Sequence, residues 1–369
     1  MTDTLPPMDV AGRLPRLRAR MAEQDCEALL VTTLANVRYL TGFSGSAALL
    51  LVLPDELVLS TDGRYQFQSA EQLAAAGVDA RIEIGNLPAQ KVAMGAAASG
   101  LARLGLEAAN VTWAKKRTFA SGWFPEAELV PTEGLVEGLR RVKDDGEVAR
   151  VAAAAAIADT ALEVVKPLLR EGVTEADFAL ALDHEMRRLG ATSTSFDTIV
   201  ASGPNGAKPH ARPSSRRVEP GELVVLDFGA VVDGYCSDMT RTVCVGEPRS
   251  VTLARMVEVV ADSQRAGVEA VRAGRSAAEV DKVCRDVIAD AGWGDAFLHS
   301  TGHGVGLDIH EAPAVAATSD DTLEAGYVVT VEPGVYLADH GGVRIEDTVV
   351  VTEDGCRTLT LAPKELVIA

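Results

Sequence analysis

Carboxylates recur in the second half of this chain at positions where they could bind a metal ion. Residues 223–243 are typical of two short strands, and Asp-Gly at 233–234 predicts a two-residue hairpin turn between them. In that register Asp227 faces Thr240, and Asp238 is a diagonal neighbour of Asp227 on the same face. No Lys or Arg separates the two carboxylates in sequence, so they repel one another unless a cation binds between them. The alternative is a pair of exposed aspartates near a turn, but the flanking Val, Leu and Phe residues indicate a buried segment.

Three of the six histidines lie within residues 299–310. His299 and His303 are four residues apart, which on a helix would make a zinc-binding pair. Three glycines between positions 302 and 306 argue against a helix and indicate an extended segment that a ligand or another backbone can approach closely. We therefore expect a site role for this segment, although a single histidine in such a place is more often structural.

Two glutamates extend the set of candidate ligands. Glu332 lies in an apolar stretch, residues 327–337, that reads as a strand, where a charge is costly unless it is paired or bound to metal. Glu346 lies in a valine-rich stretch that also reads as a strand. It stands next to Asp347 and near Arg344, so an ion pair competes with a metal role there.

The first part of the chain alternates between helix-like and strand-like stretches, which is the pattern of an α/β domain. No glycine-rich phosphate loop follows any of these strands. Asp62, Arg64 and Tyr65 could contact a substrate, but we expect local turn and packing roles for them. The expected helices are 13–24, 65–75 and 90–98, and the expected strands are 28–33, 47–53, 57–60, 80–84 and 104–107.

A charged run at 140–145 indicates a boundary, and we predict one domain at residues 1–140 and a second at 145–369. The second domain should begin with two helices and a strand, followed by a Pro/Gly-rich loop and the hairpin. Two more helices and a series of short strands should complete it. The expected helices are 147–169, 174–188, 252–273 and 277–291, and the expected first strand is 195–201.

Composition excludes several classes of function. A formal net charge of −18 argues against nucleic acid and anionic membrane surfaces as partners. No apolar run approaches the length of a membrane span, and the first residues lack the pattern of a signal peptide. The five cysteines are odd in number and scattered, which fits reduced thiols and a cytoplasmic location.

Five candidate ligands share the order and spacing of a known metal site. The chain resembles the pita-bread metallopeptidases, above all prolidase and aminopeptidase P, over nearly its whole length. Further matches are KPHARP, GHGVGLDIHE and VEPGVY in the second half, and NVRYLTGFSGS and TDGRY in the first. The residues that match the five metal ligands of that family are Asp227, Asp238, His303, Glu332 and Glu346.

The resemblance implies an α+β fold, with an α/β creatinase-like amino-terminal domain before a pita-bread catalytic domain. The catalytic domain would contain a curved antiparallel sheet flanked by helices. Asp227 would chelate one metal, Asp238 and Glu346 would bridge two, and His303 and Glu332 would bind the second. Four carboxylates balance two divalent cations, and one imidazole favours Mn²⁺ or Co²⁺, with Zn²⁺ as an alternative.

The implied activity is hydrolysis of Xaa-Pro peptide bonds by a hydroxide that bridges the two metals. Small peptides with proline at the second position would be the substrates. Glu332 would also shuttle a proton, and His210 and His310 would contact the substrate. Arg344 and Tyr336 match further positions near the site. The remaining histidines are not expected to bind metal. His299 is expected to be structural or to lie outside the ligands, and His184 and His340 are expected at the surface.

Other functions remain open on sequence alone. A methionine aminopeptidase shares the fold, but the extra first domain and the KPHARP motif argue against it. A creatinase-like hydrolase works without metal and lacks most of the ligands, and a non-catalytic binding module would be expected to lose them. The sequence does not separate dipeptidase from aminopeptidase activity, and the resemblance suggests a homodimer.

Overall fold

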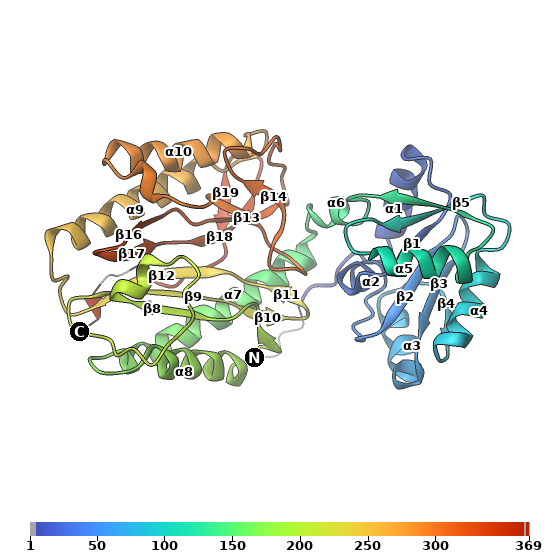
Figure 1. Cartoon of the computed structure of the whole chain (residues 1–369), viewed down its shortest axis with the longest axis horizontal. Helices are drawn as coiled ribbons and strands as arrows, with labels where there is room; N and C mark the ends of the chain where they lie inside the picture. Colours follow the sequence, from blue (N-terminus) through green and yellow to red (C-terminus); the bar gives the residue numbers. More distant parts are fainter. Residues whose placement is uncertain (1–4, 365–366, 369) are drawn as a thin grey trace. The chain divides into compact units, whose positions relative to one another are not determined.

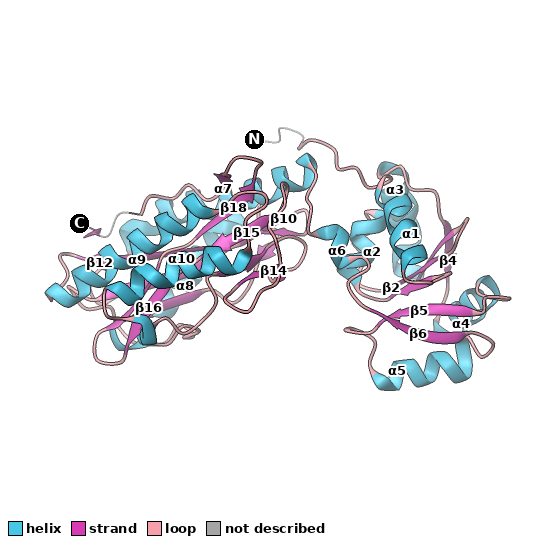
Figure 2. Ribbon diagram, turned by 90° about the horizontal axis from the view of Figure 1, so that it is seen from above, coloured by secondary structure: helices cyan, strands magenta, loops and turns pink. Residues whose placement is uncertain are grey.

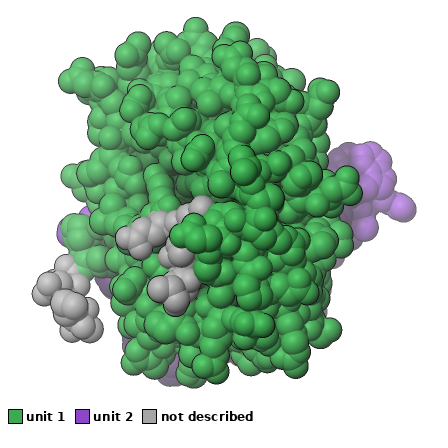
Figure 3. Space-filling model, turned by 90° about the vertical axis from the view of Figure 1, so that its left-hand side faces the viewer, with its two compact units in different colours: residues 1–6, 141–369 green, residues 7–140 purple. Residues whose placement is uncertain are grey.

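The computed structural model describes residues 5–364 and 367–368, and the chain divides into two compact units (Figures 1 and 3). The amino-terminal unit consists of Pro7–Arg140, and the carboxy-terminal unit contains the chain from Arg141 onward together with Leu5 and Pro6. All five cysteines are free thiols, as expected from their scattered positions. Within the described residues, none of the helices has the length and apolar character needed to cross a bilayer.

The amino-terminal unit is built on a mixed sheet with the strand order β4-β3-β2-β1-β5-β6. The pairs β1–β5, β5–β6 and β3–β4 are parallel, whereas β2 is antiparallel to both β1 and β3. Helices and strands alternate along the chain, as predicted (Figure 2). The helices are α1 (Arg13–Glu23), α2 (Leu34–Thr41), α3 (Gln66–Ala75), α4 (Leu87–Ala97), α5 (Trp113–Thr118) and α6 (Glu137–Arg140), and the strands are β1 (Leu29–Val31), β2 (Ala48–Val52), β3 (Leu57–Thr61), β4 (Arg81–Ile84), β5 (Arg103–Glu107) and β6 (Glu128–Thr132).

Helix α2 was not among the helices predicted for this unit. It ends where Gly42 takes the left-handed conformation, with φ of 75°, which glycine adopts without steric cost. Asp62 has the local role that we expected. Its side chain accepts a hydrogen bond from Arg64 N and pairs with the Arg64 guanidinium, while the Tyr65 hydroxyl contacts Ser46.

The carboxy-terminal unit contains two pairs of helices and a set of mostly antiparallel sheets. The strand orders are β11-β10-β7, β20-β12-β9-β8, β14-β13-β15-β18-β19 and β16-β17. The helices are α7 (Asp145–Val165), α8 (Glu175–Arg188), α9 (Val251–Ala270) and α10 (Ala277–Asp290). The strands are β7 (Ser193–Thr194), β8 (Ile199–Ser202), β9 (Leu223–Phe228), β10 (Ala230–Val232), β11 (Tyr235–Cys236), β12 (Met239–Val245), β13 (Gly302–Gly304), β14 (Glu311–Val315), β15 (Val328–Val331), β16 (Gly334–Leu337), β17 (Gly341–Arg344), β18 (Asp347–Val351), β19 (Cys356–Thr358) and β20 (Val367–Ile368).

The helix pairs cover the sheets from opposite sides, α7 and α8 on one side and α9 and α10 on the other (Figure 1). The first pair packs on β8, β9 and β12, where the small side chains of Ala154 and Ala158 meet Val224 and Leu226. The second pair packs on β15, β17 and β18. Burial of these apolar faces stabilises the unit by roughly 25 cal/mol for each Å² removed from water.

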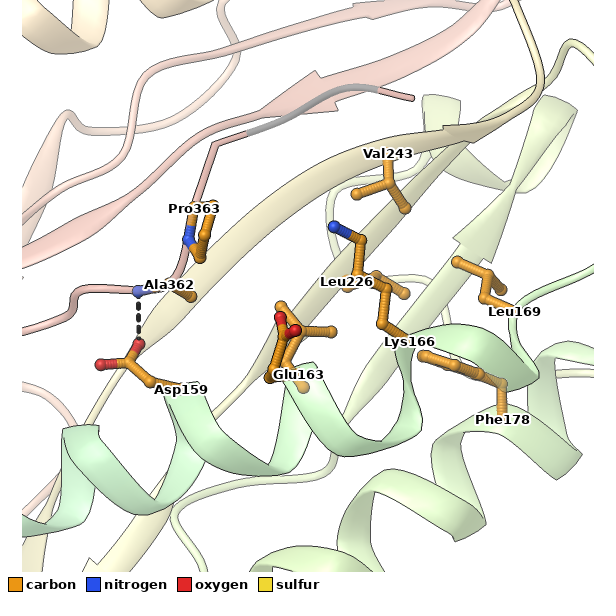
Figure 4. Close-up of a pocket in the computed structure, with 10 residues that line it drawn as sticks. Asp159, Glu163, Lys166, Leu169, Phe178, Leu226, Val243, Ala362 and Pro363 are labelled. Carbon is orange, nitrogen blue, oxygen red and sulfur yellow. Dashed lines mark hydrogen bonds between the residues drawn. The ribbon is translucent and has the colours of Figure 1, made fainter. Parts of the chain in front are cut away.

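One face of β9 belongs to the helix side. Figure 4 shows Leu226, Val243 and Phe178 lining a small pocket beside α7. At the same place the Asp159 carboxylate accepts hydrogen bonds from the backbone N–H groups of Leu361 and Ala362, both at 2.8 Å, and so ties the end of the chain to α7. Because side chains alternate along a strand, the residue after Leu226 must face the opposite side.

Several predicted boundaries were wrong. Helix α4 begins three residues before its predicted start, and α9 ends three residues before its predicted end. The helix expected at 147–169 begins at Asp145, where Asp144 and Glu147 form a capping box, and gives way to a 3-10 turn at Lys166–Leu168 that contains Pro167. The strand expected at 195–201 is confined to β8, which pairs with β9, because Ser195 is bonded instead to the hairpin through its backbone N to Gly229 O and through its hydroxyl to the carbonyl groups of Ala230 and Ser237. The remaining short helices are 3-10 turns at Gly63–Tyr65, Gly203–Ala207 and Gly294–Ala296 and a π turn at Phe119–Trp123.

Candidate metal centre

The hairpin has the register that the sequence predicted. Val232 pairs with Tyr235, and Thr240 pairs with Asp227. At the turn, Asp233 and Gly234 have positive φ angles of 51° and 77°, as the favoured two-residue hairpin turn requires. The hairpin is shared between two sheets, but its register is the same in both. Because Leu226 faces α7, its neighbour Asp227 faces away from α7.

Three carboxylates converge on this face of the hairpin. Asp227, Asp238 and Glu346 each offer an oxygen that lies within 4.8 Å of the others. Asp238 stands between β11 and β12, and Glu346 stands between β17 and β18 rather than inside the strand that we predicted. The Glu346 backbone N–H donates to Thr240 O at 3.1 Å, which brings this second strand break against β12. Interrupted strands of this kind redirect side chains, and here they turn two carboxylates toward Asp227.

His303 and Glu332 complete the cluster. The Nε2 atom of His303 lies 3.5 Å from a carboxylate oxygen of Asp238 and 3.5 Å from one of Glu332. His303 lies in β13, which is extended as expected from its glycines. Glu332 follows the last residue of β15, so its predicted place within a strand was wrong by one position. The five residues that the family resemblance indicated therefore lie around one point.

Local hydrogen bonds fix which nitrogen of His303 faces the carboxylates. Its Nδ1 lies 3.0 Å from Gly304 O, so Nδ1 carries the proton and donates to this carbonyl. The lone pair of Nε2 is then directed at Asp238 and Glu332, which is how a metal-binding imidazole is oriented. Burial lowers the pKa of His303 to about 4, so the ring is neutral at physiological pH.

The cluster concentrates negative charge inside the protein. Burial and the neighbouring carboxylates raise the pKa of Asp238 and of Glu346 well above their usual values. Burial raises the pKa of Glu332 to about 8, although the nearby Arg344 guanidinium opposes this shift. A bound cation would offset this repulsion, and without one some of these groups must keep a proton to remain buried.

The carboxylates also retain free coordination capacity. Asp227 Oδ1 and Glu346 Oε1 are buried and accept no hydrogen bond from any residue that the structure describes. A buried carboxylate oxygen without a partner is costly, and a divalent cation would satisfy it. A donor set of carboxylate oxygens with one imidazole nitrogen fits divalent metal ions.

A chain of hydrogen bonds leads from the cluster along the pocket wall. The Arg344 guanidinium pairs with Asp227 and donates to the Tyr336 hydroxyl at 2.7 Å. The same hydroxyl lies 2.8 Å from Nε2 of His299. Burial lowers the pKa of His299 to about 4 and raises that of Tyr336 to about 12. The outer role expected for His299 agrees with this arrangement.

A pocket opens over the cluster. The two further predicted histidines, His210 and His310, both line it and are exposed. The rings of His310 and His303 lie edge to face with centroids 4.4 Å apart. The carboxylate of Glu311, directly after His310, accepts a hydrogen bond from Asp308 N at 3.1 Å and pairs with Lys143 Nζ at 3.1 Å.

The last two histidines of the sequence lie away from this pocket. His184 is exposed on α8, as expected. His340 follows β16 and is partly buried rather than fully at the surface.

Sequence reasoning missed two threonines that support the ligands. Thr240 donates its hydroxyl proton to Glu346 Oε2 at 2.7 Å and accepts a hydrogen bond from Arg344 Nε at 3.0 Å. Thr330 accepts a hydrogen bond from His303 N at 3.1 Å and lies 3.3 Å from Glu332 Oε1. The hairpin register already placed Thr240 opposite Asp227, so the signal for this residue was present in the sequence.

Comparison with known proteins gives the same family over both units. Residues 149–353 match the metallopeptidase family M24, and residues 13–142 match the creatinase/prolidase amino-terminal domain. The uncharacterized peptidase YqhT of Bacillus subtilis (strain 168) is 43% identical over 356 residues, which are 96% of this chain and 99% of that protein.

Solved structures agree with this assignment. An Xaa-Pro dipeptidase from Bacillus anthracis superposes with a TM-score of 0.93 at 40% identity, covering 98% of this chain and 100% of that one. An X-Pro aminopeptidase from Thermotoga maritima MSB8 gives a TM-score of 0.86 at 33% identity, covering 95% and 100%. The expected creatinase-like and pita-bread architecture is thereby confirmed. The chain belongs to metallopeptidase family M24 and is a metallopeptidase with a creatinase/prolidase amino-terminal domain.

Proposed function

We propose that this protein is an exopeptidase that hydrolyses the Xaa-Pro bond of small peptides with two divalent cations bound at the carboxylate cluster. The observation that supports this most directly is the convergence of Asp227, Asp238 and Glu346 within 4.8 Å, with His303 and Glu332 beside them. The names of the relatives support the substrate class, since the solved structures include an Xaa-Pro dipeptidase and an X-Pro aminopeptidase.

The proposed ligand roles follow from the geometry of the cluster. Asp227, Asp238 and Glu346 would hold one cation, and Asp238 and Glu346 would be shared with a second. His303 Nε2 and Glu332 would bind that second cation, because both face Asp238. Two such cations supply an activated water and polarise the scissile carbonyl.

Glu332 is suited to move a proton. Its carboxyl group lines the pocket beside His303 and would be ionised once a cation binds. A carboxylate within reach of the attacking water and of the leaving amine can accept a proton from the first and pass it to the second. A role in proton transfer would agree with the place of Glu332, which lines the pocket just after the end of β15.

His210, His310 and Arg344 would position the peptide. The histidines line the pocket from separate loops, and an imidazole N–H at either place can donate a hydrogen bond to a peptide carbonyl group. The guanidinium of Arg344 holds Asp227 and Tyr336 in place and so maintains the wall of the site.

The pocket wall also suits a proline side chain. Phe196, Ile199 and Ile309 contribute apolar surface beside the polar cluster. A proline nitrogen carries no N–H, so a site for the Xaa-Pro bond needs no acceptor at that atom and can present apolar surface to the ring. This feature supports an Xaa-Pro bond over a bond to a residue with a free amide N–H.

A substrate panel tests the proposal. Protein freed of metal with a chelator would be supplied with Mn²⁺, Co²⁺ or Zn²⁺ and given Xaa-Pro, Xaa-Pro-Yaa and Met-Ala peptides. We expect cleavage of proline-containing peptides only when metal is added, and the ratio of dipeptide to tripeptide cleavage would separate dipeptidase from aminopeptidase activity. Release of Met from Met-Ala without cleavage of Xaa-Pro peptides would instead indicate methionine aminopeptidase activity.

We also propose a cytoplasmic homodimer. The free thiols support a reducing compartment. In the amino-terminal unit, Phe67, Leu87 and Val92 are exposed by 77%, 66% and 72%, and large apolar side chains at the surface are candidates for a subunit contact. Light scattering after size exclusion would measure the mass, and Phe67→Ser with Val92→Ser should shift it toward the monomer.

A further inference from the structure

The loop that carries His210 is long and lies between β8 and β9. Residues 203–222 include Pro209, His210 and Arg212, all of which line the pocket. The His210 side chain is exposed, so its place at the pocket depends on how the loop backbone is held. Long loops without regular structure are flexible unless specific contacts order them.

A single buried carboxylate is bonded to this part of the chain on both sides of His210. Glu175, the first residue of α8, has a relative exposure of 0%. Its Oε1 accepts hydrogen bonds from the backbone N and hydroxyl of Ser202, at 2.7 and 2.8 Å. Its Oε2 accepts hydrogen bonds from the backbone N and hydroxyl of Ser214, at 3.1 and 2.6 Å. Ser202 and Ser214 stand on either side of His210, so Glu175 closes the segment between them.

Further contacts tighten the same closure. The Asn205 amide donates to both oxygens of Glu175, at 3.1 Å each. The Glu175 backbone N–H donates to Arg216 O at 3.0 Å, and the Arg216 guanidinium donates to the Ser202 hydroxyl at 2.7 Å. The loop is therefore bonded to the start of α8 through both its main chain and its side chains.

The carboxylate is charged in this buried place. Burial raises the pKa of Glu175, but the hydrogen bonds from Ser214 and Ser202 outweigh burial and lower the pKa below its usual value. The N-terminal end of α8 adds a favourable dipole for an anion. Hydrogen bonds to a charged acceptor are shorter and stronger than those to a neutral group, so this network orders the loop more firmly than amide acceptors would.

We propose that Glu175 is a positioning residue for His210, because its carboxylate closes the loop of residues 202–214 and so holds His210 at the pocket. This inference rests on the proposed function, in which His210 contacts the peptide. Within the described residues, the Glu175 carboxylate is hydrogen-bonded to Ser202, Asn205 and Ser214 and to none of the candidate metal ligands. Its effect on catalysis would therefore pass through the loop.

The amino-terminal unit supplies a matched control. The Glu107 carboxylate, 6% exposed, accepts hydrogen bonds from the backbone N of Thr32 at 2.6 Å and of Thr33 at 2.9 Å. It also accepts a hydrogen bond from the Asn36 amide at 2.7 Å. Glu107→Gln removes the same charge from the same kind of network in a unit that lacks His210. Both variants should lower the thermal midpoint.

The experiment compares Glu175→Gln with Glu107→Gln in the metal-loaded full chain. We expect Glu175→Gln to speed hydrogen exchange in peptides covering 202–216 and to lower kcat/KM for an Xaa-Pro peptide by about 10–100-fold. Glu107→Gln should change neither quantity. Equal effects of the two variants on both readouts would overturn the proposal. If Glu175→Gln does not fold, Ser214→Ala removes one of the same bonds and should show a smaller change in the same direction.

A double-mutant cycle separates positioning from a general structural effect. In a His210→Ala background, Glu175→Gln should lower kcat/KM by less than about twofold, because the group it positions is gone. The proposal would be contradicted if the fold-loss in kcat/KM of the double variant equalled the product of the fold-losses of the two single variants.

The readouts also separate failure of this inference from failure of the proposed function. Absence of Xaa-Pro cleavage by the unaltered protein, or an unchanged kcat/KM in His210→Ala, would count against the proposed function. The exchange rate of residues 202–216 would still decide whether Glu175 closes the loop, and an unchanged rate in Glu175→Gln would overturn the closure.

Discussion

The four carboxylates at the cluster share one physical difficulty, which is buried negative charge. Asp238 and Glu346 lie beside one another with raised pKa values, and the Arg344 guanidinium pairs with the cluster at Asp227. Four ionised carboxylates with one arginine leave an excess of negative charge that bound divalent cations would offset. His303 adds a neutral nitrogen ligand whose orientation is set by Gly304 O.

Removal of a shared ligand should abolish metal binding at the pair of sites. Glu346→Gln and Asp238→Asn keep the size of each side chain but remove one charge and one oxygen ligand. We expect each to weaken Mn²⁺ binding at least about 100-fold in calorimetric titrations and to lower kcat in parallel. Asp320→Asn, at an exposed position of the same unit, is the control. Unaltered Mn²⁺ affinity in both site variants would contradict the assignment.

The raised and lowered pKa values predict how stability of the metal-free protein depends on pH. Folding raises the pKa of Glu332 from 4.5 to about 8, so its contribution to stability is lost as pH rises through that window. Folding lowers the pKa of His303 from 6.5 to about 4, so its contribution is lost as pH falls below 6.5. The two effects oppose one another below pH 6.5, and above it the loss from Glu332 adds to that from Asp238 and Glu346, whose pKa values folding also raises.

We therefore expect the chelated protein to lose stability between pH 6.5 and pH 8, by up to about 1.4 kcal/mol per pH unit for each titrating carboxyl group. Saturating Mn²⁺ should remove this loss, since the cation replaces the proton. Urea midpoints at half-unit steps of pH, with and without metal, measure both effects. A chelated protein that is more stable at pH 8 than at pH 6.5 would contradict the expectation that ionisation of the buried carboxyl groups destabilises the fold.

The hairpin of β9, β10, β11 and β12 brings the first two ligands together. It continues in one register across two sheets, and Gly229 stands at the point where the strands change sheets. A Cβ at Gly229 would lie 1.9 Å from Ser237 O, next to Asp238. The close approach of the two chains, rather than a positive φ angle, therefore requires glycine here.

Gly229→Ala should push the segment of Ser237 and Asp238 outward. We expect a stability loss of about 1–3 kcal/mol together with weaker Mn²⁺ binding, because the displaced chain carries a shared ligand. Gly355→Ala, where nothing lies within 4 Å of the added Cβ, is the matched control in the same unit. Urea unfolding and metal titration measure the two consequences, and wild-type Mn²⁺ affinity in Gly229→Ala would show that the hairpin does not set the ligand geometry.

The two units have separate apolar cores, and all described ligands lie in the carboxy-terminal one. Metal binding therefore acts directly on one unit. A ligand that binds only the folded state stabilises the region that forms its site.

Mn²⁺ should slow hydrogen exchange in the carboxy-terminal unit and leave the amino-terminal unit unchanged. The expected protection falls on peptides covering 223–245, 299–315 and 328–348, which contain the five ligands and the strands that hold them. Exchange mass spectrometry of chelated and metal-loaded protein measures it. Protection confined to 7–140 would contradict the location of the site.

Local sequence patterns predicted much of the arrangement. The Asp233-Gly234 turn determined the hairpin register, and with it the positions of Asp227 and Thr240, because a two-residue loop leaves one pairing available. The glycines around His303 predicted an extended segment, because glycine is unfavourable in a helix. The family resemblance added the order and spacing of all five ligands, but their local patterns did not show that they would meet.

Element boundaries near the site could not be predicted from the same patterns. Glu332 and Glu346 stand just outside strands, and the segment of residues 195–198 leaves the sheet although its sequence is strand-like. In each case the deciding contact comes from a distant segment. Thr240 O binds Glu346 N, Thr301 O accepts from Glu332 N, and Ser237 O accepts from the Ser195 hydroxyl. Short strand patterns carry no information about such partners.

The sequence by itself determined the chemical types of the ligands, the hairpin that joins two of them and the division into an α/β part and a later part rich in strands. These depend on interactions between residues close in the chain, which alternation, turn chemistry and capping make readable. Only the tertiary structure decided that Glu346, His303 and Glu332 meet the hairpin, that Thr240 and Thr330 support them, and that Glu175 closes the loop of His210. Those contacts join residues far apart in the chain, and they arise from the packing of strands and helices, which no local pattern specifies.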